Sequence, residues 1–141
     1  MQELNYDDIQ VGDALPSHVC GPITRTTLAM FAGGSGDHNP IHIDIDFAKK
    51  FGMDDVFAHG MLSMAYLAQI LTNWVDQRQL REYGVRFTSI TPVLATITCE
   101  GRVTEKLEID GEPCLKLDIT ACIDDGTQTL LGDAIVGFAE T

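Results

Sequence analysis

The sequence predicts one α+β domain in which a long apolar helix is covered by a curled antiparallel sheet. Two observations lead to this prediction. Residues 59–74 form an almost wholly apolar helical segment, and the segments after residue 95 alternate between apolar and polar residues. The chain has 141 residues, a length that can bury one core of its own. No repeat, low-complexity tract or linker divides it, so we assign residues 1–141 to a single domain.

The first third of the chain predicts two helices separated by a polar turn. Residues 6–16 are interpreted as a leading loop or short strand. A helix is expected to begin after Thr24, a residue type favoured at the N-cap, and to stop at Gly33-Gly34. A turn-rich segment continues to Pro40, and a second, short helix is expected over residues 46–51.

The third expected helix, residues 59–74, has apolar residues on nearly every face. A helix of this kind is buried, because a surface helix shows a polar face to water. Other elements must therefore cover it on all sides. Its apolar residues are Met61, Leu62, Met64, Ala65, Leu67, Ala68, Ile70, Leu71 and Trp74.

Strands that can cover this helix follow it in the sequence. Residues 95–104 and 115–124 alternate between apolar or small side chains and polar ones, the period of a strand with one face in water. Two Asp-Gly pairs after these runs are turn signals of the hairpin type. Residues 85–90 and 130–139 are expected to form further strands. Alternation of this kind is typical of an antiparallel sheet.

Composition and charge argue against several classes of function. The net charge of −12 is unfavourable for binding nucleic acid or anionic membranes, which requires clustered cations. No segment approaches the roughly 20 apolar residues of a membrane span. The N-terminus lacks the pattern of a signal peptide, so a cytoplasmic location is expected. The four cysteines have no metal-type spacing and are expected to be reduced packing residues.

The residues best suited to chemistry lie in the segment 31–42, which reads FAGGSGDHNPIH. Asp37 and His42 are five residues apart, and Pro40 between them disfavours a helix, so this segment is extended or turned. A bend of this kind can aim a carboxylate and an imidazole at one water molecule, and the pair can then act as general acid and base. The side-chain amide of Asn39 is in a position to orient one of them.

The same residues also have purely structural interpretations. Asp-x-Asn-Pro is a common turn sequence, in which Asp37 or Asn39 only caps a helix. His38 is expected in an exposed loop, and His18 at an edge or on the surface. His59, just before the apolar helix, is more often a capping or packing residue than a base.

Metal binding is not expected from the spacing of the histidines. His38 and His42 alone have the i, i+4 spacing of ligands on one helix face, and Pro40 between them disfavours that helix. We therefore assign no metal and no cofactor.

Gly60 stands where the expected apolar helix begins. The first N–H groups of a helix have no partner within it, and the positive end of the helix dipole lies there. Such a position can stabilise an oxyanion that develops on a thioester carbonyl. Alternatively, the glycine only permits close packing.

Taken as a motif, residues 35–42 (SGDHNPIH) followed by AHGM at 58–61 resemble the MaoC-like family of (R)-specific enoyl-CoA hydratases and 3-hydroxyacyl dehydratases. The family motif is matched without a gap, and YGVRFTSITPV at 83–93 is similar to the strand after the family's central helix. The resemblance covers nearly the whole chain. Within the family, the chain is most similar to the catalytic subunit of mycobacterial-type (3R)-hydroxyacyl-acyl-carrier-protein dehydratases.

The resemblance implies the hot-dog fold and a reaction. The reaction is (R)-specific hydration of trans-2-enoyl thioesters, or dehydration of (3R)-hydroxyacyl thioesters, carried by coenzyme A or acyl carrier protein. Asp37 and His42 would bind the catalytic water, Asn39 would support them, and the Gly60 N–H would polarise the thioester carbonyl. The residues that the motif places beside the substrate are Ser35, Gly36, His59 and Met61.

The resemblance also implies a dimer with the thioester sites at or near its interface. A homodimer is the first expectation, and a heterodimer with a related subunit is the alternative. Coenzyme A and acyl carrier protein are anionic, so either partner would need a local basic patch on this acidic chain. The candidates for that patch are Lys49, Lys50, Arg81, Arg86 and Arg102.

Two other functions are compatible with such a fold. A hot-dog thioesterase would direct water at the carbonyl carbon with a carboxylate and would not need the paired histidine. A non-catalytic acyl-binding subunit would need neither member of the pair. The intact motif around Asp37 and His42 favours the hydratase over both.

Overall fold

The computed structural model describes residues 4–138. Within them the chain forms, in order, the elements η1 (Tyr6–Asp8), β1 (His18–Cys20), α1 (Arg25–Ser35), η2 (Pro40–His42), α2 (Ile45–Lys50), α3 (Gly60–Thr72), η3 (Gln77–Gln79), β2 (Leu80–Phe87), β3 (Ile97–Ile109), β4 (Glu112–Ile123) and β5 (Gln128–Gly137). The η elements are single 3-10 turns.

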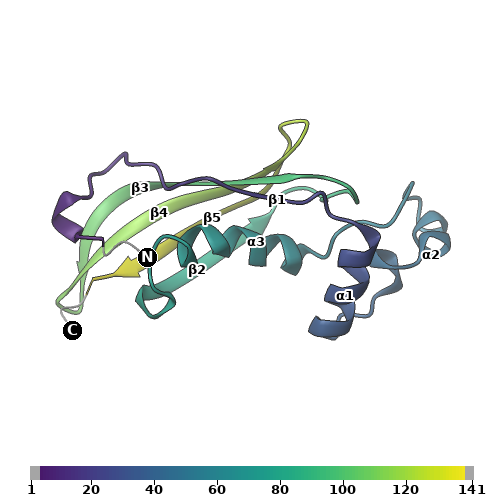
Figure 1. The fold of residues 1–141 in the computed structure, drawn as a ribbon, viewed down its shortest axis with the longest axis horizontal. Helices are drawn as coiled ribbons and strands as arrows, with labels where there is room; N and C mark the ends of the chain where they lie inside the picture. Colours follow the sequence, from purple (N-terminus) through teal and green to yellow (C-terminus); the bar gives the residue numbers. More distant parts are fainter. Residues whose placement is uncertain (1–3, 139–141) are drawn as a thin grey trace.

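One antiparallel sheet with the strand order β1-β3-β4-β5-β2 curves along one side of α3 (Figure 1). The alternating residues of β3 and β4 turn their apolar side chains toward the helix, and these side chains are buried together with those of α3. The predicted α+β architecture with a curled antiparallel sheet is confirmed. The buried residues that make this contact include Ile97, Cys99, Val103, Leu115, Leu117, Ile119, Leu67, Ile70 and Leu71.

The prediction that α3 is buried all round is wrong for the single chain. Leu67 and Leu71 on its sheet-facing side are completely buried, whereas Met61 is 58% exposed and Ala65 is exposed. The sheet covers only one side of the helix, so the apolar residues on the other side remain open in this chain.

The first helix begins as predicted and ends later than predicted. The Thr24 side chain accepts a hydrogen bond from the N–H of Thr27, which is the N-cap contact. The helix then continues through Gly33-Gly34 and ends at Gly36, whose φ of 78° is the left-handed conformation of a glycine cap. Both inner glycines lie in open space, so no neighbour forces the chain to turn there.

Strand boundaries also differ from the predicted ones. The strand expected at 85–90 is β2, which starts at Leu80 and ends at Phe87. β3 continues beyond residue 104, because a register shift between Val103 and Glu105 changes the phase of its alternation without ending the ladder. β5 was expected to reach Ala139, which lies outside the described residues.

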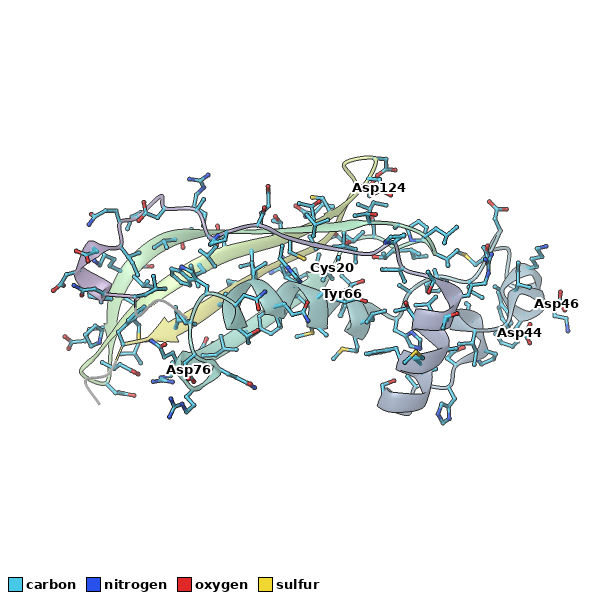
Figure 2. All side chains as sticks on the ribbon, in the orientation of Figure 1. Cys20, Asp44, Asp46, Tyr66, Asp76 and Asp124 are labelled. Atoms are coloured by element: carbon cyan, nitrogen blue, oxygen red, sulfur yellow. The ribbon has the colours of Figure 1, made fainter. Side chains whose placement is uncertain are left out.

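The remaining features are the cap of α2, which was not predicted, the cysteines and membrane segments. The start of α2 is capped by Asp44, whose carboxylate accepts the N–H groups of Asp46 and Phe47 (Figure 2). All four cysteines are free thiols, as predicted. In the part of the chain that the structure describes, no helix is long and apolar enough to cross a membrane.

Candidate active site

Three successive hydrogen bonds from its own side chains to its main chain hold the loop between α1 and η2. Ser35 Oγ accepts the N–H of Asp37 at 3.2 Å, and Asp37 Oδ1 accepts the N–H of Asn39 at 3.2 Å. Asn39 Oδ1 in turn accepts the N–H of Ile41 at 3.1 Å and caps the turn that carries the histidine. Short polar side chains favour turns because they can bond to nearby backbone in this way. The sequence SGDHNP thus builds its own bend.

His42 is fixed in orientation by the segment before α3. Its Nδ1 lies 2.7 Å from the carbonyl oxygen of Phe57, and its ring meets the Phe57 ring edge-on at 5.0 Å. A carbonyl oxygen can only accept, so Nδ1 carries the proton and donates it. Nε2 of the neutral ring therefore has a free lone pair, which is the form that a general base requires. The side chain is 9% exposed.

His59 contacts both Asp37 and His42. It is 1% exposed, and its Nε2 lies 3.2 Å from the main-chain oxygen of Asp37, to which it donates. Its ring stacks on that of His42 with 4.0 Å between centroids, and the Phe31 ring packs against it. Burial lowers the pKa of His59, and the neighbouring His42 lowers it further. A neutral, buried His59 thus supports Asp37 through the backbone and His42 through its ring.

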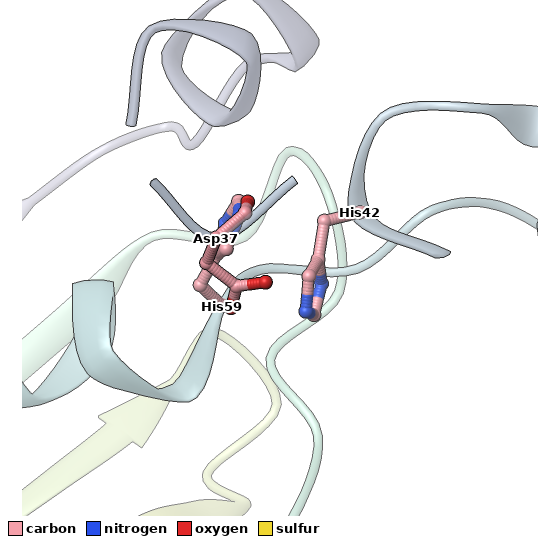
Figure 3. Close-up of side chains that lie close together, drawn as sticks. All are labelled: Asp37, His42 and His59. Atoms are coloured by element: carbon pink, nitrogen blue, oxygen red, sulfur yellow. The ribbon is translucent and has the colours of Figure 1, made fainter. Parts of the chain in front are cut away.

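Asp37, His42 and His59 gather at one point (Figure 3). One potential ligand atom of each lies within 4.8 Å of those of the other two. The Asp37 carboxylate is exposed and points toward the His42 ring, while both imidazoles are buried. The structure brings together the carboxylate and imidazole that the sequence singled out. A water between them would have a base on one side and an acid or acceptor on the other.

Gly60 opens α3 beside a cavity of about 320 Å³. The cavity is also lined by Phe57, Ser63 and the segment 87–91, and Ser63 hydrogen-bonds to Thr91 at its buried side. A Cβ on Gly60 would lie 2.8 Å from the Phe87 ring, so close packing explains the glycine as well. Both interpretations of Gly60 therefore have a structural basis: it packs tightly, and its helix-start position faces a cavity.

The other predicted residues have varied positions. Asn39 donates its main-chain N–H to Asp37. Its side-chain amide was expected to orient one member of the pair, but the amide oxygen caps η2. Met61 is exposed on the open side of α3. His59 makes no capping hydrogen bond through its side chain, so packing describes it better than capping. Phe57 was missed, because it acts through a main-chain carbonyl that every residue type has.

The predicted basic patch does not converge in the single chain. Arg81 forms an ion pair with Glu112 at 2.6 Å, and Arg102 donates to the main-chain oxygen of Gly12. Lys49 and Lys50 lie on α2 near Asp44, at the opposite end of the molecule from Asp76 and η3 (Figure 2). His38 is exposed, as expected for a loop residue. His18 lies on the edge strand β1, as expected, and hydrogen-bonds to Gln69 of α3.

Comparison of the sequence with known protein families identifies the family of this chain. The sequence model of the MaoC-like domain matches residues 9–120. The chain belongs to the MaoC-like domain family. The match includes the loop with Asp37 and His42, the start of α3 at Gly60 and most of the sheet, so the family resemblance drawn from the motif is confirmed.

Individual MaoC-like relatives agree with this assignment. The chain is 28% identical over 139 residues to the (R)-specific enoyl-CoA hydratase of Rhodospirillum rubrum, covering 93% of this chain and 89% of that protein. It is 40% identical over 84 residues to 3-hydroxyacyl-thioester dehydratase X of Mycobacterium tuberculosis, covering 59% of this chain and 28% of the longer protein.

A solved structure shows the same fold. The R-hydratase PhaJ1 from Pseudomonas aeruginosa superposes with a TM-score of 0.79 at 25% identity, covering 96% of this chain and 92% of that one. The architecture of the MaoC-like chain is therefore the hot-dog fold.

Proposed function

We propose that this MaoC-like protein hydrates trans-2-enoyl thioesters to (3R)-hydroxyacyl thioesters and catalyses the reverse dehydration. The single observation that carries the proposal is the placement of the Asp37 carboxylate beside the oriented imidazole of His42. The relatives are named as hydratases and a dehydratase, which supports the same reaction for this chain.

The proposed reaction uses the tautomer of His42 that the Phe57 carbonyl fixes. In our working version, Nε2 takes a proton from a water bound between His42 and Asp37, and the resulting hydroxide equivalent bonds to C3. The electron pair of the double bond moves to C2 and the thioester carbonyl, and C2 takes the proton of Asp37, which enters the reaction as the carboxylic acid and is left as the carboxylate. Transfer of the proton on His42 back to Asp37 completes the cycle. Dehydration runs through the same steps in reverse.

The carbonyl would be stabilised at the start of α3. The N–H of Gly60, with the positive end of the helix dipole behind it, supplies a donor for the enolate oxygen. The cavity of about 320 Å³ next to Gly60 is the proposed site for the acyl chain. Ser35, Gly36 and Met61 are proposed to lie beside the substrate. His59, predicted there as well, is 1% exposed and supports the loop from behind instead.

The substrate partner is an acyl thioester of coenzyme A or acyl carrier protein, in the cytoplasm. We further propose a homodimer, with a heterodimer as the alternative. The proposal is supported by β2, an edge strand with an unpaired side, and by apolar side chains exposed near it. Phe87 is 55% exposed and Met61 on the open side of α3 is 58% exposed. Light scattering after size-exclusion chromatography would give the mass; a monomer at working concentration would contradict the proposal.

One assay distinguishes this function from its rivals. The protein is incubated with crotonyl-CoA while enoyl absorbance and free thiol are followed together. Loss of absorbance without thiol release supports hydration. Release of thiol would identify a thioesterase, and inactivity toward crotonyl-CoA, a longer enoyl-CoA and enoyl-carrier protein would identify a non-catalytic subunit. Chiral analysis of the product must give the (3R) isomer.

A further inference from the structure

His59 has a nitrogen that the proposed reaction does not use. Among the described residues, His59 Nδ1 is the one buried side-chain nitrogen or oxygen without a hydrogen-bond partner. Its ring is 1% exposed. Because Nε2 donates to the main-chain oxygen of Asp37, the proton is on Nε2 and Nδ1 keeps a lone pair. An unpaired buried acceptor is costly, and in native structures it calls for an explanation, such as a bound water or ion.

The two residues beside His59 present the same kind of atom. His42 Nε2 has a free lone pair, since Nδ1 donates to Phe57. The Asp37 carboxylate is exposed and carries one oxygen that no loop N–H occupies. Two neutral imidazoles and one carboxylate are the donor set of catalytic zinc sites and of the open two-histidine, one-carboxylate sites of other transition metals.

The surroundings of the two imidazoles also fit metal ligands. A ligating histidine usually donates its second N–H to a carbonyl or carboxylate, which fixes the tautomer and ring orientation. His42 does so to Phe57 and His59 to Asp37. One potential ligand atom of each residue lies within 4.8 Å of those of the other two. Ligands about 2.1 Å from one ion lie roughly 3–3.5 Å apart. The side chains must therefore move closer to bind one ion, Asp37 by rotation of its exposed side chain and the stacked His42 and His59 rings by a change in their relative tilt.

We propose that Asp37, His42 and His59 bind a divalent transition-metal ion, with Zn²⁺ as the best match, and that this ion inhibits the protein. Imidazole ligands favour Zn²⁺ over Mg²⁺ or Ca²⁺, which prefer oxygen. A metal bond on His42 Nε2 occupies the lone pair that must accept a proton, and the metal also takes the Asp37 carboxylate. The inhibition rests on the proposed function, whereas the binding does not. The local spacing of the histidines could not reveal this site, because His59 is 22 residues from Asp37.

Metal binding is tested first, without substrate. Tag-free protein is dialysed to equilibrium against Zn²⁺, and Co²⁺ is added separately to follow its visible absorption. We expect one Zn²⁺ per chain, and at least about tenfold weaker binding in His59→Gln, since the loss of outer partners alone commonly costs 10–100-fold. His38→Gln changes an exposed histidine of the same loop and is expected to bind as the parent does. Asp37→Asn keeps the loop bond and gives a second ligand variant if His59→Gln does not fold.

Several outcomes would overturn the site. These are the absence of saturable binding, equal binding by the parent, His59→Gln and Asp37→Asn, or an equal loss in His38→Gln. Inhibition is then tested by adding Zn²⁺ to the crotonyl-CoA assay, where hydration must fall with occupancy and return with a chelator. Unchanged hydration at full occupancy would refute the inhibition. A metal-free protein without hydration contradicts the proposed function instead, and the dialysis result still decides the site.

Discussion

Asparagine at position 37 separates the chemistry of the site from its folding. The Asp37 side chain is exposed, and its one contact within the loop is the N–H of Asn39 at 3.2 Å, accepted by Oδ1. Asparagine retains an Oδ1 in the same place, so the turn that positions His42 should persist. We expect Asp37→Asn to change the free energy of unfolding by less than about 1 kcal/mol, the scale of exposed electrostatic contacts.

Asp37→Asn should have a much larger effect on activity than on stability. A positioned acid or base contributes about a hundredfold or more to the rate, which corresponds to about 2.7 kcal/mol in the activation free energy. The amide cannot deliver or accept the proton, so kcat for crotonyl-CoA hydration should fall at least about a hundredfold. Urea unfolding of the same preparation measures the first quantity, and the decline of enoyl absorbance measures the second.

A matched control lies on the neighbouring helix. Asp44 is also exposed and also accepts backbone N–H groups, those of Asp46 and Phe47, but in α2. Asp44→Asn should therefore reproduce the small stability change while leaving hydration unchanged. Near-full activity of Asp37→Asn, or an equal loss in both variants, would refute the assignment of Asp37 as a reacting group.

Three further predictions follow from the contacts of the site. His42→Ala should lower the rate of hydration at least about a hundredfold, which the absorbance assay measures. It should also lower the free energy of unfolding by about 1–3 kcal/mol, measured by urea titration, because the Phe57 carbonyl loses its hydrogen-bond donor. Because the pKa of His59 is lowered from 6.5 in the folded protein, the unfolded chain binds protons first, so stability should be full above pH 6.5 and fall below it. His59→Gln should flatten this fall in urea midpoints measured from about pH 7.5 to 5.5, and an unchanged slope would contradict the interpretation. Gly60→Ala would place a methyl group 2.8 Å from the half-exposed Phe87 ring, which can turn away, so activity should fall about tenfold to hundredfold with little loss of stability. Phe87→Leu added to Gly60→Ala should not restore the rate if the methyl group blocks the substrate.

Features that depend only on residues a few positions apart in the chain were predictable from the sequence. Thr24 caps α1, and alternation in β3 and β4 gives the buried face, because both effects act within a few residues. The Asp110-Gly111 pair forms the expected turn, with φ of 50° and 81°. The stop at Gly33-Gly34 failed because glycine weakens a helix without ending it, and the left-handed cap at Gly36 was available one turn later.

The candidate site also has a part that could be predicted from the sequence and a part that could not. Asp37 and His42 are close in sequence and joined by a loop that bonds to itself, so their meeting follows from local chemistry. His59 reaches Asp37 across 22 residues through a ring and a main-chain oxygen, and neither partner leaves a signal in residue spacing. The carbonyl of Phe57 leaves none at all. The open side of α3 also escaped prediction, since apolarity alone does not say which chain covers a helix.

The proposed reacting groups, together with the residues that support them, all lie between residues 31 and 60. The end of β2 and the loop after it contribute the segment 87–91, which lines the cavity beside Gly60 together with residues 57–63. We therefore expect the preference for acyl chains to depend in part on a stretch of the polypeptide that holds none of the proposed reacting groups. Exchange of residues 87–91 for those of another family member should alter the preferred acyl length while leaving the proton-transfer apparatus intact. Such an exchange would change the acyl chain that the protein accepts and leave Asp37 and His42 in place.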